Sequence, residues 1–437
     1  MNTPVCDFVR AYAQREPARL HMPGHKGKPF LGCETLDITE IDGAGNLYAP
    51  DGIIAESEEN ASRLFGCRTY YSAEGSSLCI RAMLLLAQQI TGRSAVLAAR
   101  NAHRAFLSAA ALLDLDVHWL HPQPDEIYQS CTVTPEDAER ALQSVRPAAV
   151  YLTSPDYLGN LADVAAIAQV CRRHGVLLLV DNAHGAYLHF LPQPCHPMDL
   201  GADLCCDSAH KTLPVLTGGA YLHVSPRLGL PARQVKDALA LFGSSSPSYL
   251  ILQSLDRTNV YLESYTGRLA AFLPRVQALH ASLRAHGYTL CGGEALKLTV
   301  RAKPFGYTGD ELASLLAREN VFCEMHDPDY LVCMLTPESG EDCVRLQNAL
   351  LRIPRRPGLT DAPPAYRAPQ QVMSVRKACL APQETLPVTG PEELTAIEEV
   401  SMPLTGVTEN VSGVIAEETA AQTRTLTDNA STEETQE

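Results

Sequence analysis

The segment VLLLV at residues 176–180, followed directly by Asp181, constrains the fold more than any other part of the sequence. An apolar run without alternation indicates a strand covered on both faces, as in a parallel sheet flanked by helices. AAVYLT at 148–153 is a similar run, and residues 163–174 show the apolar spacing of a helix that ends at Gly175. The sequence therefore predicts an α/β fold with a mainly parallel sheet.

The pattern divides the chain into several parts, because 437 residues exceed what one compact core usually holds. The composition after about residue 390 is rich in Thr, Glu and Ala, which is typical of disorder. Capping boxes are predicted at Thr308 with Glu311 and at Ser339 with Asp342. The predicted parts are an N-terminal extended arm (1–60), a large α/β domain (61–245), a linking helical segment (246–284), a small C-terminal α/β domain (285–390) and an acidic disordered tail (391–437).

Charge and cysteine usage exclude several classes of partner and site. The net charge is −15, and residues 392–437 alone hold eleven acidic residues against one basic residue. Nucleic acid and anionic membranes are therefore not expected as partners, because they need a basic face. No apolar run approaches the roughly 20 residues of a membrane span. The fourteen cysteines form no C-x-x-C pair, so reduced thiols in the cytoplasm and no metal site are expected.

The spacing of two histidines could suggest a metal site, but the residues between them argue against it. His21 and His25 have the i,i+4 spacing of a helical metal pair, but Pro23 and Gly24 lie between them. Proline and glycine disfavour a regular helix at this point.

The segment DSAHKT at 207–212 carries the strongest chemical signal. An isolated lysine is ordinarily a solvated surface cation, but Lys211 follows an apolar strand and has Ser208 and His210 beside it. These two neighbours could donate hydrogen bonds to a phosphate. Lys211 could condense with an aldehyde once burial lowers the pKa of its amine.

Asp181 stands at the carboxyl end of a central strand, where open α/β sheets bind their ligands. A carboxylate there could keep a pyridine nitrogen protonated, although an N-cap is the alternative. Three residues later, His184 could reach a ring hydroxyl or could be a hydrogen-bonded core histidine.

Two further segments are weaker signals. Gly75, Ser76 and Ser77 open a predicted helix, whose N-terminus could bind an anion, although small residues there are commonly caps. His103, in RNAH after the strand AVLAA, could stack on a planar ring or serve as an ordinary loop histidine.

Together these segments resemble the fold-type I pyridoxal-phosphate enzymes, which share the aspartate-aminotransferase-like fold, and specifically the Orn/Lys/Arg decarboxylase family in its short bacterial form. The matching motifs occur in family order across residues 20–385. They are HMPGHKG at 21–27, the helix opening at 75–77, RNAH at 100–103, TSPDYLG at 153–159, VDNAHGA at 180–186, DSAHKTLPVLTGGAYLHV at 207–224 and SSSPSY at 244–249.

The resemblance implies pyridoxal 5'-phosphate as cofactor and a role for each matching residue. Lys211 would form a Schiff base with it, Asp181 would pair with the pyridine nitrogen, His103 would stack on the ring, and His184 would stand near the ring hydroxyl. The residues implied at the phosphate are Gly75, Ser76, Ser77, Ser208 and His210. The serines at 244–246, Ser245 above all, would reach the phosphate of a neighbouring subunit, so a homodimer or higher oligomer is expected.

The activity that the resemblance implies is decarboxylation of arginine, lysine or ornithine to CO2 and an amine, a polyamine precursor. Transamination or β-elimination on the same scaffold and a non-catalytic homologue that binds the cofactor are the alternatives. Three features depart from the family pattern: Asn182 and Glu74 replace the usual residues, and a Pro-rich C-terminal segment is missing. No carboxylate for a cationic side chain is evident from the sequence.

Overall fold

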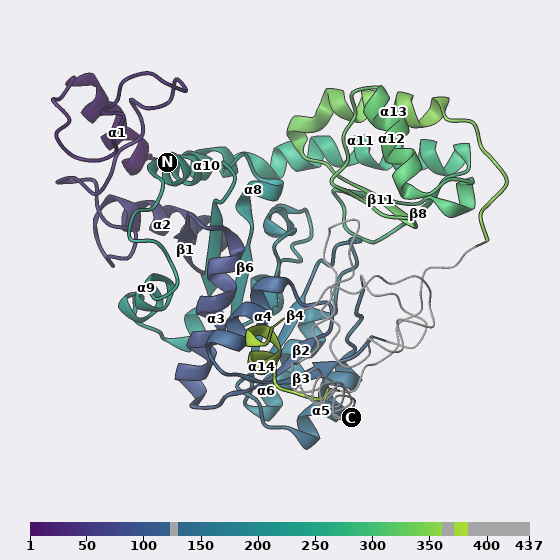
Figure 1. Ribbon diagram of the computed structural model, residues 1–437, viewed down its shortest axis with the longest axis horizontal. Helices are drawn as coiled ribbons and strands as arrows, with labels where there is room; N and C mark the ends of the chain where they lie inside the picture. The colour runs from purple at the N-terminus through teal and green to yellow at the C-terminus, as the bar shows by residue number, and fades with distance from the viewer. Residues whose placement is uncertain (123–129, 361–370, 383–437) are drawn as a thin grey trace, which may run out of the picture.

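Two β-sheets organise the part of the chain that the computed structural model describes, which is residues 1–122, 130–360 and 371–382 (Figure 1). The larger sheet has seven strands, of which only β7 runs antiparallel to its neighbours. Its order is β1 (Arg68–Ser72), β7 (Ala220–Val224), β6 (Leu204–Asp207), β5 (Leu177–Asp181), β4 (Ala149–Thr153), β2 (Ala95–Ala99) and β3 (Asp116–Leu120). The mainly parallel α/β fold predicted from the sequence is confirmed.

Helices cover both faces of this sheet. On one face lie α3 (Gly75–Thr91), α4 (Arg104–Leu112) and α9 (Ala232–Ala240), and on the other lie α5 (Pro135–Ser144) and α6 (Val164–His174). Strand β5 contributes to both cores: Leu179 packs on the first face, and Leu178 and Val180 pack on the second. This two-sided burial explains why the strand is apolar without interruption.

Helix α6 forms where the sequence predicts it. Asp163 caps its N-terminus by accepting a hydrogen bond from the backbone N–H of Ala166, and Gly175 ends it in the left-handed conformation at φ +63°. Its apolar positions Ile167 and Cys171 are buried against the sheet.

The N-terminal sixty residues are less extended than predicted. Two helices, α1 (Pro4–Gln14) and α2 (Gly52–Phe65), flank an irregular stretch. Val5 and Val9 of α1 lie in the same core as the buried leucines of α10 (Tyr249–Leu262). The predicted absence of a helix at His21 and His25 holds, since both lie in bends and turns.

A second body follows α10 (Tyr249–Leu262) and α11 (Tyr265–His286). Its antiparallel sheet has the order β10 (Met325–His326), β11 (Tyr330–Met334), β9 (Lys297–Arg301), β8 (Thr289–Cys291), packed with α11, α12 (Gly309–Arg318) and α13 (Gly340–Arg352) (Figure 1). We call this body the small domain and the seven-stranded sheet with its helices the large domain. The capping box at Thr308 is confirmed. The one at Ser339 is wrong, because Ser339 closes a box with Thr336 instead.

The last described helix, α14 (Val375–Leu380), returns to the large domain and packs on α4 (Figure 1). The Arg376 side chain donates to the Ala111 carbonyl at 2.8 Å, which satisfies an orphan acceptor at the end of α4. The predicted acidic tail lies outside the described residues. The remaining short helices are η1 (Ala186–Phe190), α7 (Pro197–Leu200), α8 (Ala209–Thr212), η2 (Pro226–Leu228), η3 (Lys303–Phe305) and η4 (Pro337–Ser339).

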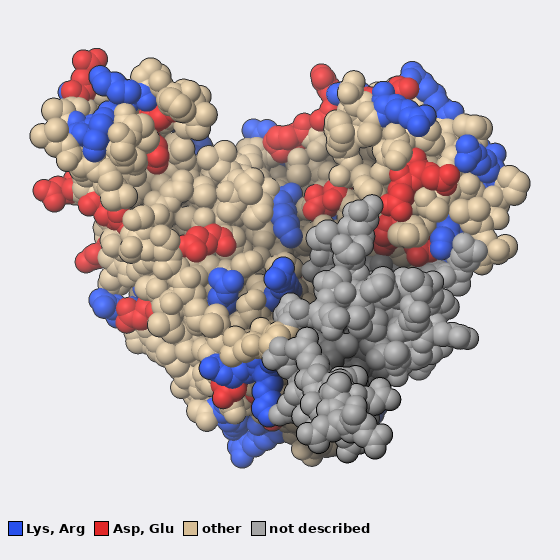
Figure 2. Space-filling model, in the orientation of Figure 1, with Lys and Arg blue, Asp and Glu red and all other residues tan. Residues whose placement is uncertain are grey.

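The surface carries both signs of charge. Figure 2 shows acidic and basic side chains interspersed on the face in view, with broad uncharged areas between them. None of the helices in the described ranges has both the length and the apolar character needed to cross a bilayer.

Candidate active site

The candidate site lies at the carboxyl edge of the large sheet. Asp181 ends β5, Ser208 follows β6, the start of α3 follows β1, and His103 follows β2. These strands are parallel to one another, so their carboxyl ends share one edge, which is where open α/β sheets bind ligands.

The Asp181 carboxylate is buried and held by three donors. The Tyr151 hydroxyl donates to Oδ2 at 3.1 Å, the backbone N–H of Ala183 donates to Oδ1 at 3.2 Å, and the Cys206 thiol lies 3.6 Å from Oδ1. All three donors are uncharged, so none of them is a counter-ion for the carboxylate. An ionised carboxylate at this position is suited to stabilise a protonated ring nitrogen.

Lys211 lies on α8 with its amine close to His184. The Nζ atom is 2.9 Å from His184 Nε2. Burial lowers the pKa of the Lys211 amine, although the negative charges of Asp181 and Glu324 oppose the shift. Burial and the nearby amines also lower the pKa of His184 well below its ordinary value. A neutral amine beside a neutral imidazole can act as a nucleophile toward an aldehyde.

The residues predicted at the phosphate come together around the first turn of α3. Ser208 donates its hydroxyl to the Ser76 hydroxyl at 2.8 Å, and Ser77 follows Ser76 on the helix. Gly75 opens the helix at φ +71°, a conformation that favours glycine. No side chain among the described residues caps this helix, so its N–H groups can serve an anion.

Backbone hydrogen bonds connect the first turn of α3 to the loop before β7, which follows the segment with Lys211. The backbone N–H of Gly75 donates to the Gly218 carbonyl at 2.7 Å. His210 places its Nδ1 atom 3.0 Å from the Gly219 carbonyl, so that ring nitrogen donates and is not available to a phosphate. Burial lowers the pKa of His210.

His103 caps α4 by accepting a hydrogen bond at Nδ1 from the backbone N–H of Ala105 at 3.1 Å. The residue is otherwise exposed at the site. Partial desolvation lowers its pKa, while the charge of Asp181 opposes the shift and that of Lys211 adds to it. The ring is therefore within electrostatic reach of both.

The Ser244–Ser246 loop contacts the site of its own chain through Glu74. The Ser244 backbone N–H donates to Glu74 Oε1 at 2.6 Å, which binds this carboxylate to the loop. Ser245 is exposed, and no contact found in the described residues joins its side chain to Ser76 or Ser208.

Four residues near the site were not predicted. Lys297 on β9 lies 3.2 Å from His184 Nδ1, and Glu294 pairs with Lys297 at 3.0 Å. Tyr157 packs edge-on against His184, with ring centroids 5.0 Å apart, and donates its hydroxyl to Glu324 at 3.1 Å. The sequence feature that could have pointed to Lys297 is its position within the apolar run LKLTV. A lysine there is expected to be buried, and a buried amine needs a polar partner.

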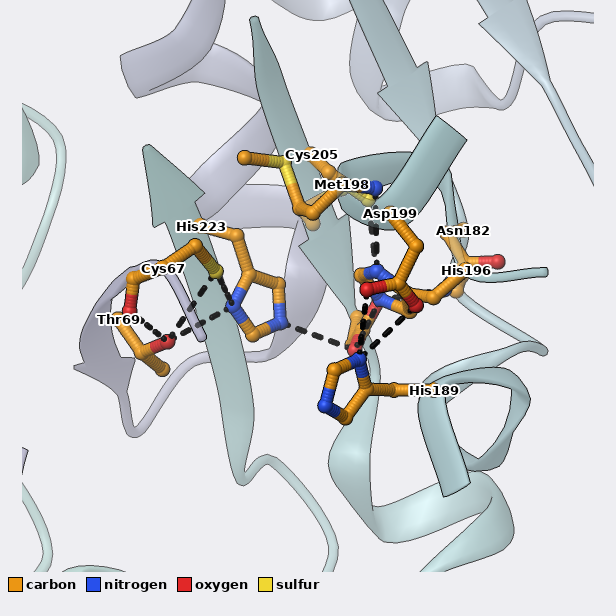
Figure 3. Close-up of polar contacts among 12 residues, drawn as sticks. Cys67, Thr69, Asn182, His189, His196, Met198, Asp199, Cys205 and His223 are labelled. Carbon is orange, nitrogen blue, oxygen red and sulfur yellow. Dashed lines mark hydrogen bonds and ion pairs between the residues drawn. The ribbon is translucent and has the colours of Figure 1, made fainter. Parts of the chain in front are cut away.

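Beside this site lies a cluster of His196, Asp207 and His223, all buried (Figure 3). Both imidazoles contact Asp207 Oδ2 through Nε2, at 3.1 and 3.0 Å. The Asn182 side-chain amide donates to Asp207 Oδ1 at 2.7 Å. This contact needs a donor, which explains why an amide stands at a position where the chain departs from the family pattern. Although burial opposes ionisation, the two imidazoles lower the pKa of Asp207.

These three residues could hold a metal ion only if both Nε2 atoms had free lone pairs. Instead, His196 Nδ1 accepts the backbone N–H of Met198 at 3.2 Å, so a neutral His196 carries its proton on Nε2 and donates to Asp207. The Thr69 hydroxyl lies 2.9 Å from Nδ1 of the other histidine, His223. The cluster is a hydrogen-bonded support for the strand end that precedes Ser208.

Comparison with known proteins decides the family. The family model described as "Orn/Lys/Arg decarboxylase, major domain" matches residues 3–272. The chain belongs to the Orn/Lys/Arg decarboxylase family. It is 32% identical to the uncharacterized protein YaaO of Bacillus subtilis over 77% of this chain and 74% of that protein. It is 30% identical to an arginine decarboxylase of Bacillus subtilis over 80% of this chain and 77% of that enzyme.

Solved structures show the fold-type I architecture for this Orn/Lys/Arg decarboxylase family member. The E. coli constitutive lysine decarboxylase superposes with a TM-score of 0.65 at 17% identity, covering 80% of this chain and 60% of that chain. Lysine decarboxylase A of Pseudomonas aeruginosa gives 0.67 at 16%, covering 80% and 59%. The chain thus spans about 60% of the length of these lysine decarboxylases. The predicted family and fold class are both confirmed.

The residues present suit pyridoxal 5'-phosphate. A buried carboxylate, an amine with a lowered pKa and a helix N-terminus lined by two linked serines are the three features that its ring nitrogen, aldehyde and phosphate require.

Proposed function

We propose that this family member is a pyridoxal-phosphate-dependent decarboxylase that converts a basic amino acid, arginine, lysine or ornithine, to an amine and CO2. The observation that carries the proposal is the joint placement of Lys211 and Asp181 at one strand edge with a carboxylate, Glu324, facing them. The resulting amine would be a polyamine precursor.

Each residue has a definite task in the proposed reaction. The bound cofactor supplies the electron sink for the pair released when the α-carboxylate leaves as CO2. Lys211 would hold the aldehyde of the cofactor until the substrate amine displaces it, and the freed amine would then donate a proton to Cα. Asp181 would pair with the protonated pyridine nitrogen, and His103 would cover one ring face. His184 would stand near the ring hydroxyl, and Gly75, Ser76, Ser77 and Ser208 would bind the phosphate, with His210 beside them.

Glu324 supports a cationic substrate. It belongs to the segment before β10 in the small domain, and its side chain is exposed apart from the hydrogen bond from Tyr157. Its negative charge opposes the lowering of the pKa of both the Lys211 amine and the His210 imidazole, so it lies within electrostatic reach of both. A carboxylate facing a site favours a guanidinium or ammonium group over an uncharged side chain.

The test is product analysis with the protein reconstituted with pyridoxal phosphate. Arginine, lysine and ornithine are each supplied, with citrulline and norleucine as uncharged analogues of similar length. CO2 with an equimolar amine from a basic amino acid, and little from the analogues, is expected. A keto acid would indicate transamination and ammonia with a keto acid β-elimination, and either overturns the proposal. Absence of turnover with all five would favour the non-catalytic homologue.

We also propose a homodimer or higher oligomer in the cytoplasm. Three large apolar residues between α1 and α2 are strongly exposed: Leu20 at 95%, Phe30 at 91% and Leu31 at 86%. Such a group is typical of a surface that another protein covers, and Ser245 would then approach the partner's phosphate. None of the fourteen cysteines, all of which lie in the described ranges, forms a disulfide, which supports a reducing compartment.

A further inference from the structure

His184 lies between two lysine amines from different domains. Its Nε2 atom is 2.9 Å from Lys211 Nζ, and its Nδ1 atom is 3.2 Å from Lys297 Nζ. His184 is buried, so water cannot substitute for either contact. A neutral imidazole has one N–H donor and one lone pair, so the two lysines cannot make the same kind of hydrogen bond to it.

The other partners of Lys297 show which lysine is the donor. Its amine forms an ion pair with Glu294 at 3.0 Å and donates to the carbonyls of Asp156 at 3.2 Å and Tyr157 at 3.4 Å. The two carbonyls only accept hydrogen bonds, and they use two of the three N–H donors of an ammonium group. The third can donate to His184 Nδ1, while the Glu294 carboxylate lies at ion-pair distance without hydrogen-bond geometry and supplies the opposite charge.

We infer that Lys297 is a positioning residue, which donates to Nδ1 of His184, fixes the proton of that ring on Nε2, and so holds Lys211 as a neutral amine that accepts from Nε2. The direction of each hydrogen bond follows from the one before it. An ammonium at Lys297 requires a lone pair at Nδ1, a proton at Nε2 and a lone pair on the Lys211 amine.

The charges around the two groups agree with this order. Burial, Lys211 and Lys297 all lower the pKa of His184, which keeps the ring neutral. Burial and Lys297 lower the pKa of Lys211. The titratable groups that face Lys211 and His184 from the surrounding elements are Asp181, Cys206, Glu324, Lys297, His103, His210 and Tyr157.

The arrangement ties the state of the amine to the small domain. Only a neutral amine attacks an aldehyde, so Lys211 must lose its proton before the cofactor is bound. Lys297 comes from β9 and reaches His184 only when the small domain lies against the large domain. The inference rests on the proposed role of Lys211, but it concerns the cofactor-free protein and is tested without turnover.

The experiment measures how the reactivity of Lys211 depends on pH in the cofactor-free protein. A brief pulse of an acetylating reagent is applied between about pH 6 and 10, and acetylation at Lys211 is read by peptide mass spectrometry relative to the exposed Lys28. For Lys297→Met we expect the midpoint of Lys211 reactivity to rise by about one pH unit, because the amine loses its fixed hydrogen-bond donor and a nearby positive charge. An unchanged or lower midpoint overturns the inference.

Two controls separate this role from a structural one. Because Lys297→Met leaves Glu294 buried without a counter-ion, the double variant Lys297→Met/Glu294→Gln is measured in parallel and should show a rise of the same sign. Lys236→Met removes another buried lysine, paired with Glu58 at 2.5 Å and remote from His184, and should leave the midpoint unchanged. An equal rise in Lys236→Met would attribute the effect to general destabilisation and overturn the inference.

A third comparison asks whether Lys297 acts through the imidazole. Lys297→Met is repeated in a His184→Gln background. Less than half of the shift should remain if His184 carries the coupling. A shift of the same size in both backgrounds would mean that Lys297 acts on Lys211 by charge alone, which contradicts the inference even if the protein decarboxylates amino acids as proposed.

Discussion

The hydroxyl of Tyr151 lies 3.1 Å from Oδ2 of Asp181 and comes from the neighbouring parallel strand. Both residues are buried, and Ala183 and Cys206 contact the other carboxylate oxygen. The orientation of the carboxylate is therefore set by residues of β4, β5 and β6 together. Removing the charge and removing its orienting hydrogen bond should have different consequences.

Asp181→Asn should leave cofactor binding intact and lower kcat by about 10²–10³-fold, because the ring nitrogen loses its negative partner. Tyr151→Phe keeps the charge and should lower kcat by no more than about tenfold, the worth of one hydrogen bond. Cofactor content and kcat for the basic amino acid are measured on both. Full activity in Asp181→Asn would show that the carboxylate does not stabilise the reacting ring.

Lys211→Ala should abolish covalent attachment of the cofactor. Reduction with borohydride followed by peptide mapping should find the adduct on the peptide with residue 211 in the unmodified protein and nowhere in the variant. Lys28→Ala, at an exposed lysine, should retain the adduct. An adduct at another lysine of the unmodified protein would refute the assignment.

Glu324→Gln should raise KM for a basic amino acid by about tenfold to a hundredfold, since a charge-assisted hydrogen bond contributes about 1.5–3 kcal/mol. KM should be the parameter that changes, because Glu324 is proposed to bind the side chain of the substrate and not to take part in the reaction. Glu338→Gln is the matched control: Glu338 accepts from Tyr261 at 2.5 Å, as Glu324 accepts from Tyr157, but it acts on neither Lys211 nor His210. Equal KM values for Glu324→Gln and the unmodified protein would exclude Glu324 from substrate recognition.

The free energy of unfolding should fall as the pH drops below about 6.5. Burial lowers the pKa of His223 below the ordinary value of 6.5, so below that pH the unfolded chain binds a proton that the folded chain does not. His223→Gln should make the dependence shallower by up to about 1.4 kcal/mol per pH unit. Urea unfolding of both proteins at several pH values from 7.5 to 5.5 measures how the free energy of unfolding depends on pH. An unchanged slope would mean that His223 is protonated in both states.

Phe30→Asp should weaken the proposed homodimer. Placing a charge in an apolar contact leaves it desolvated and unpaired, so dissociation should be detectable at micromolar protein by analytical ultracentrifugation. Phe322→Asp, at an aromatic residue of the small domain that is 80% exposed, is the control and should leave the mass unchanged. A Phe30→Asp protein of unaltered mass would place the interface elsewhere.

Much of the large domain could be predicted because its signals are local. The apolar strand before Asp181 and the caps of α6 lie within a few residues of one another. The N-terminal helix α1 was missed because the Gly- and Pro-rich stretch around it dominated the pattern. The box at Ser339 was assigned to the wrong partner, since SGED has the acidic fourth residue typical of the motif, whereas TPES closes its box with a serine at that position.

Some residues of the site could be predicted from local sequence, and others could not. Lys211, Asp181 and Ser208 follow strand ends, so a parallel sheet necessarily brings them to one edge. Lys297 and Glu324 reach the site only through the packing of the small domain, which no local pattern encodes. The contacts of Glu74 and Asn182 likewise depend on distant partners, Ser244 and Asp207.

The chain packs on the large domain on both sides of the small domain, through α10 against α2 before it and through α14 against α4 after it. Lys297 and Glu324 both belong to the small domain, and each contacts a residue of the large domain, His184 and Tyr157 respectively. A rigid-body displacement of the small domain would therefore remove both contacts at once, so the hydrogen-bond order at Lys211 and the carboxylate proposed for a cationic substrate would be lost together.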